Sequence, residues 1–269
     1  MSSAGVRIME TPAWDEWAPW FARRAHELSA AILFLTRLPL PRHAPEDGAV
    51  ARGAWAFPLA GFVVGLIAAV VYAIAHALVL FPWPAAALAV AATLFVTGAL
   101  HEDGLADTAD GFGGGDTRAR KLDIMRDSRI GTYGVCALAI SLLIRTDAIA
   151  SLTETGLVAA ALIAAHSGGR AAMAAVMFFL PPARSDGLSF TAGQPSAARA
   201  ALAAGIGFLI VLFCLGPAHA VVAVIVGAIV IALVAWLSLR QIGGQTGDVL
   251  GALEQVGECL VLMVTAARF

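Results

Sequence analysis

One short stretch of this 269-residue chain concentrates residues that could do chemistry. Between residues 101 and 129 it carries seven carboxylates, Glu102, Asp103, Asp107, Asp110, Asp116, Asp123 and Asp127, and long apolar runs flank it on both sides. Carboxylates gathered beside membrane spans repel one another unless a cation or protons neutralise them. The stretch therefore predicts a metal site of a membrane enzyme, placed where the spans meet water.

The spacing of the aspartates favours one binding face. In a helix, Asp103, Asp107 and Asp110 follow the pattern i, i+4, i+7 and lie within about 60° of one another, with Glu102 about 100° to the side. Hard oxygen ligands of this kind suit Mg²⁺ or Mn²⁺, completed by waters and substrate phosphates. Zinc would need more nitrogen or sulfur ligands than His101 alone offers. We expect these four carboxylates to hold Mg²⁺.

A phosphate site is predicted next to the carboxylates. The glycines of the run Gly111-Phe112-Gly113-Gly114-Gly115 would end the helix and let the backbone approach a ligand closely. Arg126 and Arg129 flank Asp127 and Ser128 and could present one cationic edge to phosphate oxygens. The alternative is a solvated loop whose charges pair among themselves.

Composition places the rest of the chain in a membrane. Hydrophobic residues make up 59% and charged residues 13%, against about 25% charged in a soluble domain. The net charge of -2 gives no reason to expect nucleic acid as a partner. Runs near the length of about 20 residues that a span needs are Phe57–Leu80, Pro84–Leu100, Tyr133–Ser151, Gly156–Leu180, Ala200–Leu215, Ala218–Leu239 and, more weakly, Val249–Ala267. We therefore predict an all-α polytopic transmembrane bundle of about six or seven spans with a carboxylate-rich loop.

Lysine and arginine predict the orientation. Basic residues occur before Trp55, in the loop from His101 to Thr132, and at Arg184, Arg199 and Arg240, whereas the turns at 81–84, 152–155 and 216–219 have none. Such an alternation follows the positive-inside rule. The carboxylate-rich loop is therefore expected in the cytoplasm.

The first 30 residues form a separate segment in this interpretation, followed by an integral membrane domain over 31–269. Trp14, Trp17, Trp20 and Phe21 recur at helical spacing among charged residues. This stripe fits an interfacial helix lying on the bilayer. It fits equally a helix packed on the domain or on a neighbouring subunit, so a homo-oligomer stays open.

Polar residues inside the apolar runs allow more than one interpretation. Glu254 and Glu258 are four residues apart and are functional candidates by default if they lie within a span. A last helix lying at the interface would make them ordinary. His166 and Arg170 could face the site or a neighbouring helix, and Arg145 could pair with Asp147 or extend to the surface.

Five blocks of the sequence resemble the cobalamin synthase family, also called the adenosylcobinamide-GDP ribazoletransferase family. These blocks are FLTRLPLP (34–41), AFPLAGFVVG (56–65), HEDGLADTADGFGGG (101–115), IMRDSRIGTYGV (124–135) and IGGQTGDVLGA (242–252). The DGLADTADG and IMRDSRIGTYG portions are the specific ones. The N-terminal 30 or so residues are longer than the resemblance leads us to expect.

The resemblance implies a multi-pass enzyme of the bacterial inner membrane that requires Mg²⁺. It would join adenosylcobinamide-GDP to α-ribazole or its 5′-phosphate and release GMP. On this interpretation Mg²⁺ is held by Asp103, Asp107 and Glu102, and Asp110 orients or deprotonates the attacking hydroxyl. Phosphate contacts would come from Arg126 and Arg129, with Ser128, Arg37 and the backbone of Gly113 and Gly114 as further candidates.

Two other classes of protein share parts of this pattern. Intramembrane carboxylates also mark ion pathways in cation-coupled transporters, but the carboxylate stretch lies in a long loop and no inverted repeat is visible. Carboxylates that handle a nucleotide diphosphate at a membrane face also resemble the CDP-alcohol phosphotransferases, although the aspartate spacing differs. That likeness is a mechanistic analogy only.

Overall fold

The computed structural model describes residues 14–41, 48–78, 81–152 and 154–267, with side chains from residue 20 onward. These residues form helices throughout, and their only strand-like pairing is an isolated bridge between Pro182 and Gln245. The elements are α1 (Trp14–Leu35), α2 (Ala49–Gly53), the 3₁₀ turn η1 (Ala54–Ala56), α3 (Phe57–Ala77), α4 (Pro82–Thr97), α5 (Leu100–Gly114), α6 (Arg118–Ile124), α7 (Thr132–Ala150), α8 (Thr155–Phe179), α9 (Gly187–Ala192), α10 (Ala197–Ile242) and α11 (Gly247–Ala266).

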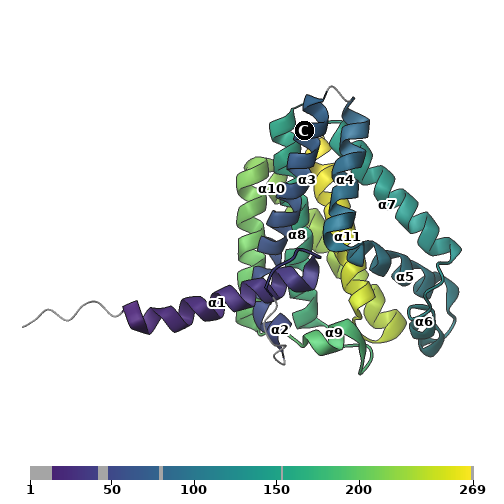
Figure 1. Cartoon of the computed structure of the whole chain (residues 1–269). Coiled ribbons are helices and arrows are strands. Elements are labelled where there is room, and N and C mark those ends of the chain that lie inside the picture. The colour runs from purple at the N-terminus through teal and green to yellow at the C-terminus, as the bar shows by residue number, and fades with distance from the viewer. Residues whose placement is uncertain (1–13, 42–47, 79–80, 153, 268–269) are drawn as a thin grey trace, which may run out of the picture.

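The predicted all-α polytopic bundle is confirmed. Five described helices are long and apolar enough to cross a membrane, or six if the bent pair α4 and α5 counts as one span. Helices α8 and α11 occupy the centre of the bundle (Figure 1), and 67% and 72% of their most apolar windows are buried. The central position of α11 removes the alternative that this helix lies at the interface.

Helix α10 consists of two arms that run side by side. Its backbone breaks at Gly216, whose φ is 75° and ψ 171°, and Pro217 follows directly. Residues 204–211 of one arm and 223–231 of the other line the same apolar groove against α8 and α11. The two arms therefore correspond to the two spans predicted separately, Ala200–Leu215 and Ala218–Leu239.

Asp103, Asp107 and Asp110 of the carboxylate stretch lie on a helix, α5, as their spacing predicted. Helix α5 leaves α4 at an angle of 90°. The bend is made by Gly98 and Ala99, with φ of 68° and 56°, and a left-handed conformation at Ala99 is unusual for a residue with a Cβ. Because of the bend, α5 departs from the direction of the spans and runs toward α6 at one end of the bundle (Figure 1).

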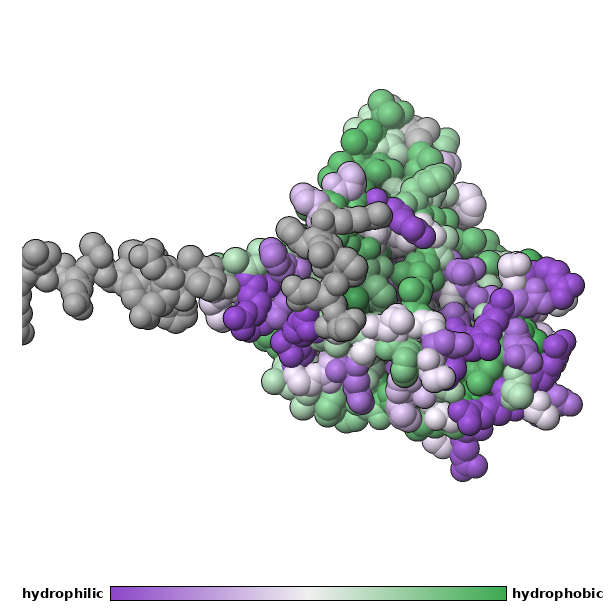
Figure 2. All heavy atoms as spheres, turned by 60° about the horizontal axis from the view of Figure 1, so that its bottom comes forward, coloured by the Kyte–Doolittle hydropathy of each residue, from purple (hydrophilic) through white to green (hydrophobic). Residues whose placement is uncertain are grey.

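That end gathers the polar connections. Helices α2, α6 and α9 and the start of α11 lie there, while the last turns of α11 lie at the opposite end (Figure 1). Hydrophilic residues cover this end in the space-filling view, in contrast to the apolar flanks (Figure 2). The loops predicted to share one side of the membrane by their lysine and arginine content thus meet in space. Arg7 and Arg42 of that prediction lie outside the described residues.

Helix α1 crosses the predicted boundary at residue 30 without a break. Beyond the boundary it packs against the body, with Ala31 and Leu35 fully buried. Before it, Trp20 and Phe21 are 45% and 60% exposed, on the part of α1 that projects from the bundle (Figure 1). The side chains of Trp14 and Trp17 lie outside the described residues.

Candidate active site

The site begins where α5 and α11 cross at close range. A Cβ on Gly104 would lie 2.7 Å from the backbone oxygen of Asp248, and one on Gly251 would lie 3.1 Å from the backbone oxygen of His101. Glycine at both positions lets the two backbones meet. The crossing places Asp248, at the start of α11, beside the aspartates of α5.

Three carboxylates from two helices share this place. Burial, followed by the negative charges of Asp103 and Asp248, raises the pKa of Asp107 to about 7. Among the described residues, the side chains of Asp103 and Asp107 form no hydrogen bond or ion pair. Three neighbouring carboxylates, two of them without a partner among the described residues, favour a bound cation, which would relieve the repulsion. We call Asp103, Asp107 and Asp248 the acidic face.

Arg184 lies against the acidic face from the connection between α8 and α9. Its NH2 group is 3.4 Å from Oδ2 of Asp248, and its Nε is 3.6 Å from Oδ1 of Asp186. Its NH1 group is buried and has no hydrogen-bond partner among the described residues. A guanidinium with donors to spare beside carboxylates suits an anionic ligand such as a phosphate.

Two connections are tied together to hold Arg184 in place. Backbone hydrogen bonds of 2.8 Å run from Ala183 N–H to the Gln245 carbonyl and from Gln245 N–H to the Pro181 carbonyl. From α6, Arg118 donates to the carbonyls of Ile242 and Ala183 at 2.7 and 2.8 Å. The segments before α9 and before α11 are therefore joined to each other and to α6.

A cavity of about 100 Å³ opens beside the acidic face. Its polar wall includes Asp103, Asp248, Arg184, Ser189 and His101, and its apolar wall includes Met173 and Met177 of α8. One buried water needs only about 10–15 Å³ measured in the same way. The cavity therefore has room for a polar group of a ligand next to the acidic face.

Asp110 has a different position from the one expected of a base or metal ligand. One of its oxygens accepts a hydrogen bond from Gly131 N–H at 2.6 Å, and the other accepts from Gly134 N–H at 2.9 Å. Gly131 is the N-cap of α7 and Gly134 lies in its first turn. The carboxylate thus satisfies free N–H groups at a helix start, where negative charge is stabilising. We correct its assignment to that of a helix cap.

Glu102 also departs from the predicted ligand set. Its side chain is buried and points into the bundle, where Oε1 accepts from Arg145 NH2 at 3.0 Å. The 100° offset from Asp103 on the helix places it on the face turned toward α7 and α11. We therefore remove Glu102 from the proposed metal site.

The arginines and the serine predicted to contact phosphate lie at the edge of the site or away from it. Arg126 donates to both oxygens of Asp186 at 2.6 Å, so it borders the segment that carries Arg184. Arg129 is 87% exposed and pairs with Asp127, whose pKa its hydrogen bonds lower to about 2. Ser128, next to them, is exposed. The structure thus brings Arg126 near the site and leaves Arg129 and Ser128 in solvent.

The remaining predicted contacts have packing neighbours. A Cβ on Gly113 would lie 2.7 Å from the ring of Tyr133, and one on Gly114 would lie 3.5 Å from Ile124. Arg37 is exposed and its side chain lies against Gly98 at the bend between α4 and α5. These residues hold α5, α6 and α7 together rather than lining the cavity.

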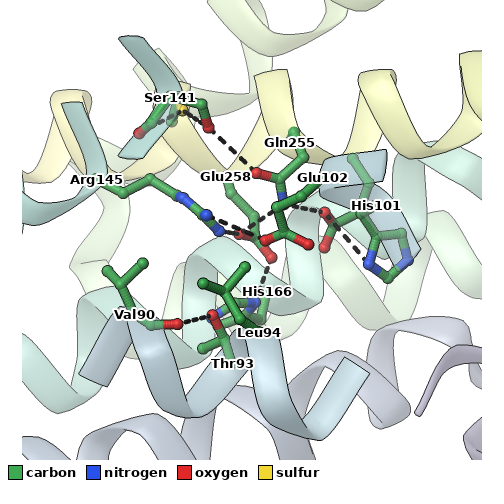
Figure 3. A network of polar contacts seen from close by, with 12 residues as sticks. Val90, Thr93, Leu94, His101, Glu102, Ser141, Arg145, His166, Gln255 and Glu258 are labelled. Atoms are coloured by element: carbon green, nitrogen blue, oxygen red, sulfur yellow. Dashed lines mark hydrogen bonds and ion pairs between the residues drawn. The ribbon is translucent and has the colours of Figure 1, made fainter. Parts of the chain in front are cut away.

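Behind the site lies a buried polar network (Figure 3). Arg145 is 3.0 Å from Glu102 and 3.0 Å from Glu258, and Arg170 pairs with Glu254 and Glu258. His166 contacts Glu258, and its Nδ1 could join Glu254 and Glu258 as a metal ligand by geometry. Two guanidinium groups already neutralise these carboxylates, so we assign no metal there.

Sequence reasoning missed Asp248 and Arg184. Asp248 belongs to the IGGQTGDVLGA block but stands 145 positions after Asp103, and no local spacing joins it to α5. In the sequence, Arg184 counted only as one of the basic residues that predict which side of the membrane each loop faces. The available signal was that both follow directly after predicted spans, on the side that carries the acidic stretch.

Comparison with known proteins decides the family. Residues 27–266 match the family described as cobalamin-5-phosphate synthase. The chain belongs to this family. It is 53% identical over 242 residues to a protein of Bradyrhizobium diazoefficiens named adenosylcobinamide-GDP ribazoletransferase, covering 90% of this chain and 93% of that one. A relative of the same name from Mesorhizobium japonicum is 50% identical over 240 residues, covering 89% and 92%. No solved structure matches the chain. The family predicted from the sequence is thereby confirmed.

Proposed function

We propose that this chain is an Mg²⁺-dependent adenosylcobinamide-GDP ribazoletransferase. It would transfer the cobinamide phosphate of adenosylcobinamide-GDP to α-ribazole or α-ribazole 5′-phosphate, releasing GMP and forming adenosylcobalamin or its 5′-phosphate. The observation that carries the proposal is the convergence of Asp103, Asp248 and Arg184 at one cavity, with Asp107 close to both aspartates. This convergence occurs in a chain whose relatives bear the name of that activity.

Each group at the site has a role in such a transfer. Asp103 and Asp248, from two helices, would hold Mg²⁺, which supplies positive charge against the diphosphate oxygens. The free NH1 of Arg184 would donate to a phosphate oxygen. Positioning and neutralisation of charge account for most of the catalysis of phosphoryl transfer.

Asp107 would accept the proton of the attacking hydroxyl. It is close enough to both proposed ligands for their charges to raise its pKa, and it carries no hydrogen bond from the described residues. As the ribazole hydroxyl oxygen bonds to the phosphorus that bears the cobinamide, its proton passes to Asp107. The bond from that phosphorus to the GMP oxygen breaks, and GMP leaves.

We further propose that the polar end faces the cytoplasm of a bacterial inner membrane. The loops rich in lysine and arginine meet at this end (Figures 1 and 2), and such loops stay on the cytoplasmic side. Side chains such as Phe95 and Phe213, each 83% exposed on the apolar flanks, would contact the lipid bilayer. The GDP group of adenosylcobinamide-GDP and the α-ribazole would then both reach the cavity from the cytoplasm.

Product analysis tests this function. The purified full chain, incubated with adenosylcobinamide-GDP, α-ribazole and Mg²⁺, should release GMP and form adenosylcobalamin in equal amounts. Omitting α-ribazole or chelating the metal should stop both products. A chain that instead consumes a CDP-alcohol, or one that releases no GMP but moves a cation across vesicles, would overturn the proposal in favour of the two alternative classes.

A further inference from the structure

His101 is a fully buried residue to which neither the fold nor the proposed reaction assigns a role. It lies at the first turn of α5, has no exposed surface, and lines the cavity beside the acidic face. Its Nδ1 lies 3.4 Å from NH2 of Arg170. The same nitrogen lies 3.8 Å from Oε2 of Glu254, the contact drawn from His101 in Figure 3. Its Nε2 has no hydrogen-bond partner among the described residues.

The neighbour on Nδ1 fixes which ring nitrogen carries the proton. A guanidinium only donates, so Nδ1 of His101 accepts from Arg170. The contact with Glu254 is too long to be a hydrogen bond that would need a proton on Nδ1. We therefore assign the neutral tautomer with the proton on Nε2. Nε2–H is then a buried donor without an acceptor, which native structures rarely leave unexplained.

Arg170 cannot rotate away and release this tautomer. Its guanidinium also pairs with Glu254 and Glu258, and Arg170 is fully buried. The buried network of Figure 3 thus ends at His101. It holds the ring in one orientation, and the Nε2 donor is left without a partner among the described residues in a side chain that lines the cavity.

We propose that His101 Nε2–H donates a hydrogen bond to a phosphoryl oxygen of the diphosphate-bearing substrate, and that Arg170 is the residue that positions it. An acceptor is required, and an anionic oxygen satisfies both this donor and the free NH1 of Arg184 on the same cavity. The inference rests on the proposed function, since it names the partner of the same cavity. A lost hydrogen bond to a charged group should weaken binding at least tenfold, about 1.4 kcal/mol.

Binding without turnover tests the proposal. Adenosylcobinamide-GDP is titrated by calorimetry into the full chain in detergent with Mg²⁺ and without α-ribazole, so that no transfer occurs. His101→Phe keeps the ring shape but removes the donor, and it should weaken binding at least tenfold. His101→Gln can accept from Arg170 and still donate, so it should bind within about threefold of the parent. His76→Phe, at the far end of α3, is the control and should bind as the parent does.

Two further measurements distinguish a lost hydrogen bond to the substrate from a general disturbance of the structure. The KM for α-ribazole should be unchanged in His101→Gln, because that substrate meets the phosphorus from the other side. In the unmutated chain labelled with ¹⁵N-histidine, the His101 resonance should show the Nε2–H tautomer and shift when adenosylcobinamide-GDP is added. The measurement itself is made on the parent chain, and the His101→Gln variant, which should bind nearly as the parent does, identifies the resonance by its loss.

Certain results would overturn the inference. These are equal binding by His101→Phe and the parent, a glutamine variant as weak as the phenylalanine variant, or an Nδ1–H tautomer. If the parent turns over and binds its substrate while these results appear, only the role of His101 fails. If the parent neither binds nor converts adenosylcobinamide-GDP, the proposed function itself fails.

Discussion

Removing Arg145 should destabilise the whole bundle, because its guanidinium joins two buried carboxylates. The side chain is 2% exposed and lies 3.0 Å from both Glu102 and Glu258. Arg145→Met keeps an unbranched side chain but leaves Glu102 without a partner among the described residues and Glu258 with only Arg170 and His166. Breaking a buried pair costs about 3–5 kcal/mol, and a chain of about this size loses roughly 2–4 °C of Tm per kcal/mol. Thermal unfolding of the full chain in detergent, followed by tryptophan fluorescence, should therefore show a Tm lower by about 6–20 °C.

A second substitution checks that charge is the cause. With neutral histidines, the network has three carboxylates, Glu102, Glu254 and Glu258, against the two guanidinium groups, a net charge of -1. Arg145→Met makes it -2, and adding Glu102→Gln returns it to -1. The double variant should regain at least half of the lost Tm. Asp147→Asn, an exposed change on the same helix, serves as the control. A single variant as stable as the parent, or a double variant no better than the single one, would refute this reasoning.

Three other changes test separate parts of the structure. Asp110→Asn should lower stability by about 1–2 kcal/mol through the lost α7 cap, measured by thermal unfolding, while divalent-metal binding persists; loss of metal binding would contradict the cap assignment. Gly104→Ala should destabilise by about 1–3 kcal/mol through overpacking against α11 and reduce turnover by displacing Asp248, whereas Gly156→Ala, which meets nothing within 4 Å, should change neither. The pKa of Asp107 is raised to about 7, so the folded chain binds a proton that the unfolded chain releases. The Tm of the metal-free chain should therefore fall as pH rises from about 4.5 to 7.5, and Mg²⁺ should reverse that fall. A Tm that does not change with pH would contradict the raised pKa of Asp107.

The sequence allowed the spans to be predicted because each is a long apolar run bounded by polar or turn-forming residues. The pair Gly216 and Pro217 separates the two arms of α10 in the sequence as it does in the structure. The bend after α4 could not be foreseen, since it depends on a left-handed Ala99 that local propensity disfavours. The bend directs the helix that carries the aspartates across α11.

The candidate site was predicted in part. Helical spacing places Asp103 and Asp107 on one face, but the same spacing included Asp110, whose carboxylate binds the backbone of α7 instead. Only tertiary structure could show that difference, because Gly131, the N-cap of α7, comes 21 residues after Asp110. The approach of Asp248 likewise depends on a glycine contact between two distant helices.

Binding of Mn²⁺, followed by electron paramagnetic resonance, tests the central claim most directly, namely that Asp103 and Asp248 hold one divalent cation. Mn²⁺ accepts the same oxygen ligands as Mg²⁺ and can be counted. We predict that Asp103→Asn and Asp248→Asn each weaken Mn²⁺ binding at least tenfold, that Asp107→Asn still binds but does not turn over, and that the exposed Asp116→Asn binds as the parent does. Unchanged Mn²⁺ binding in Asp248→Asn would contradict a site shared between α5 and α11.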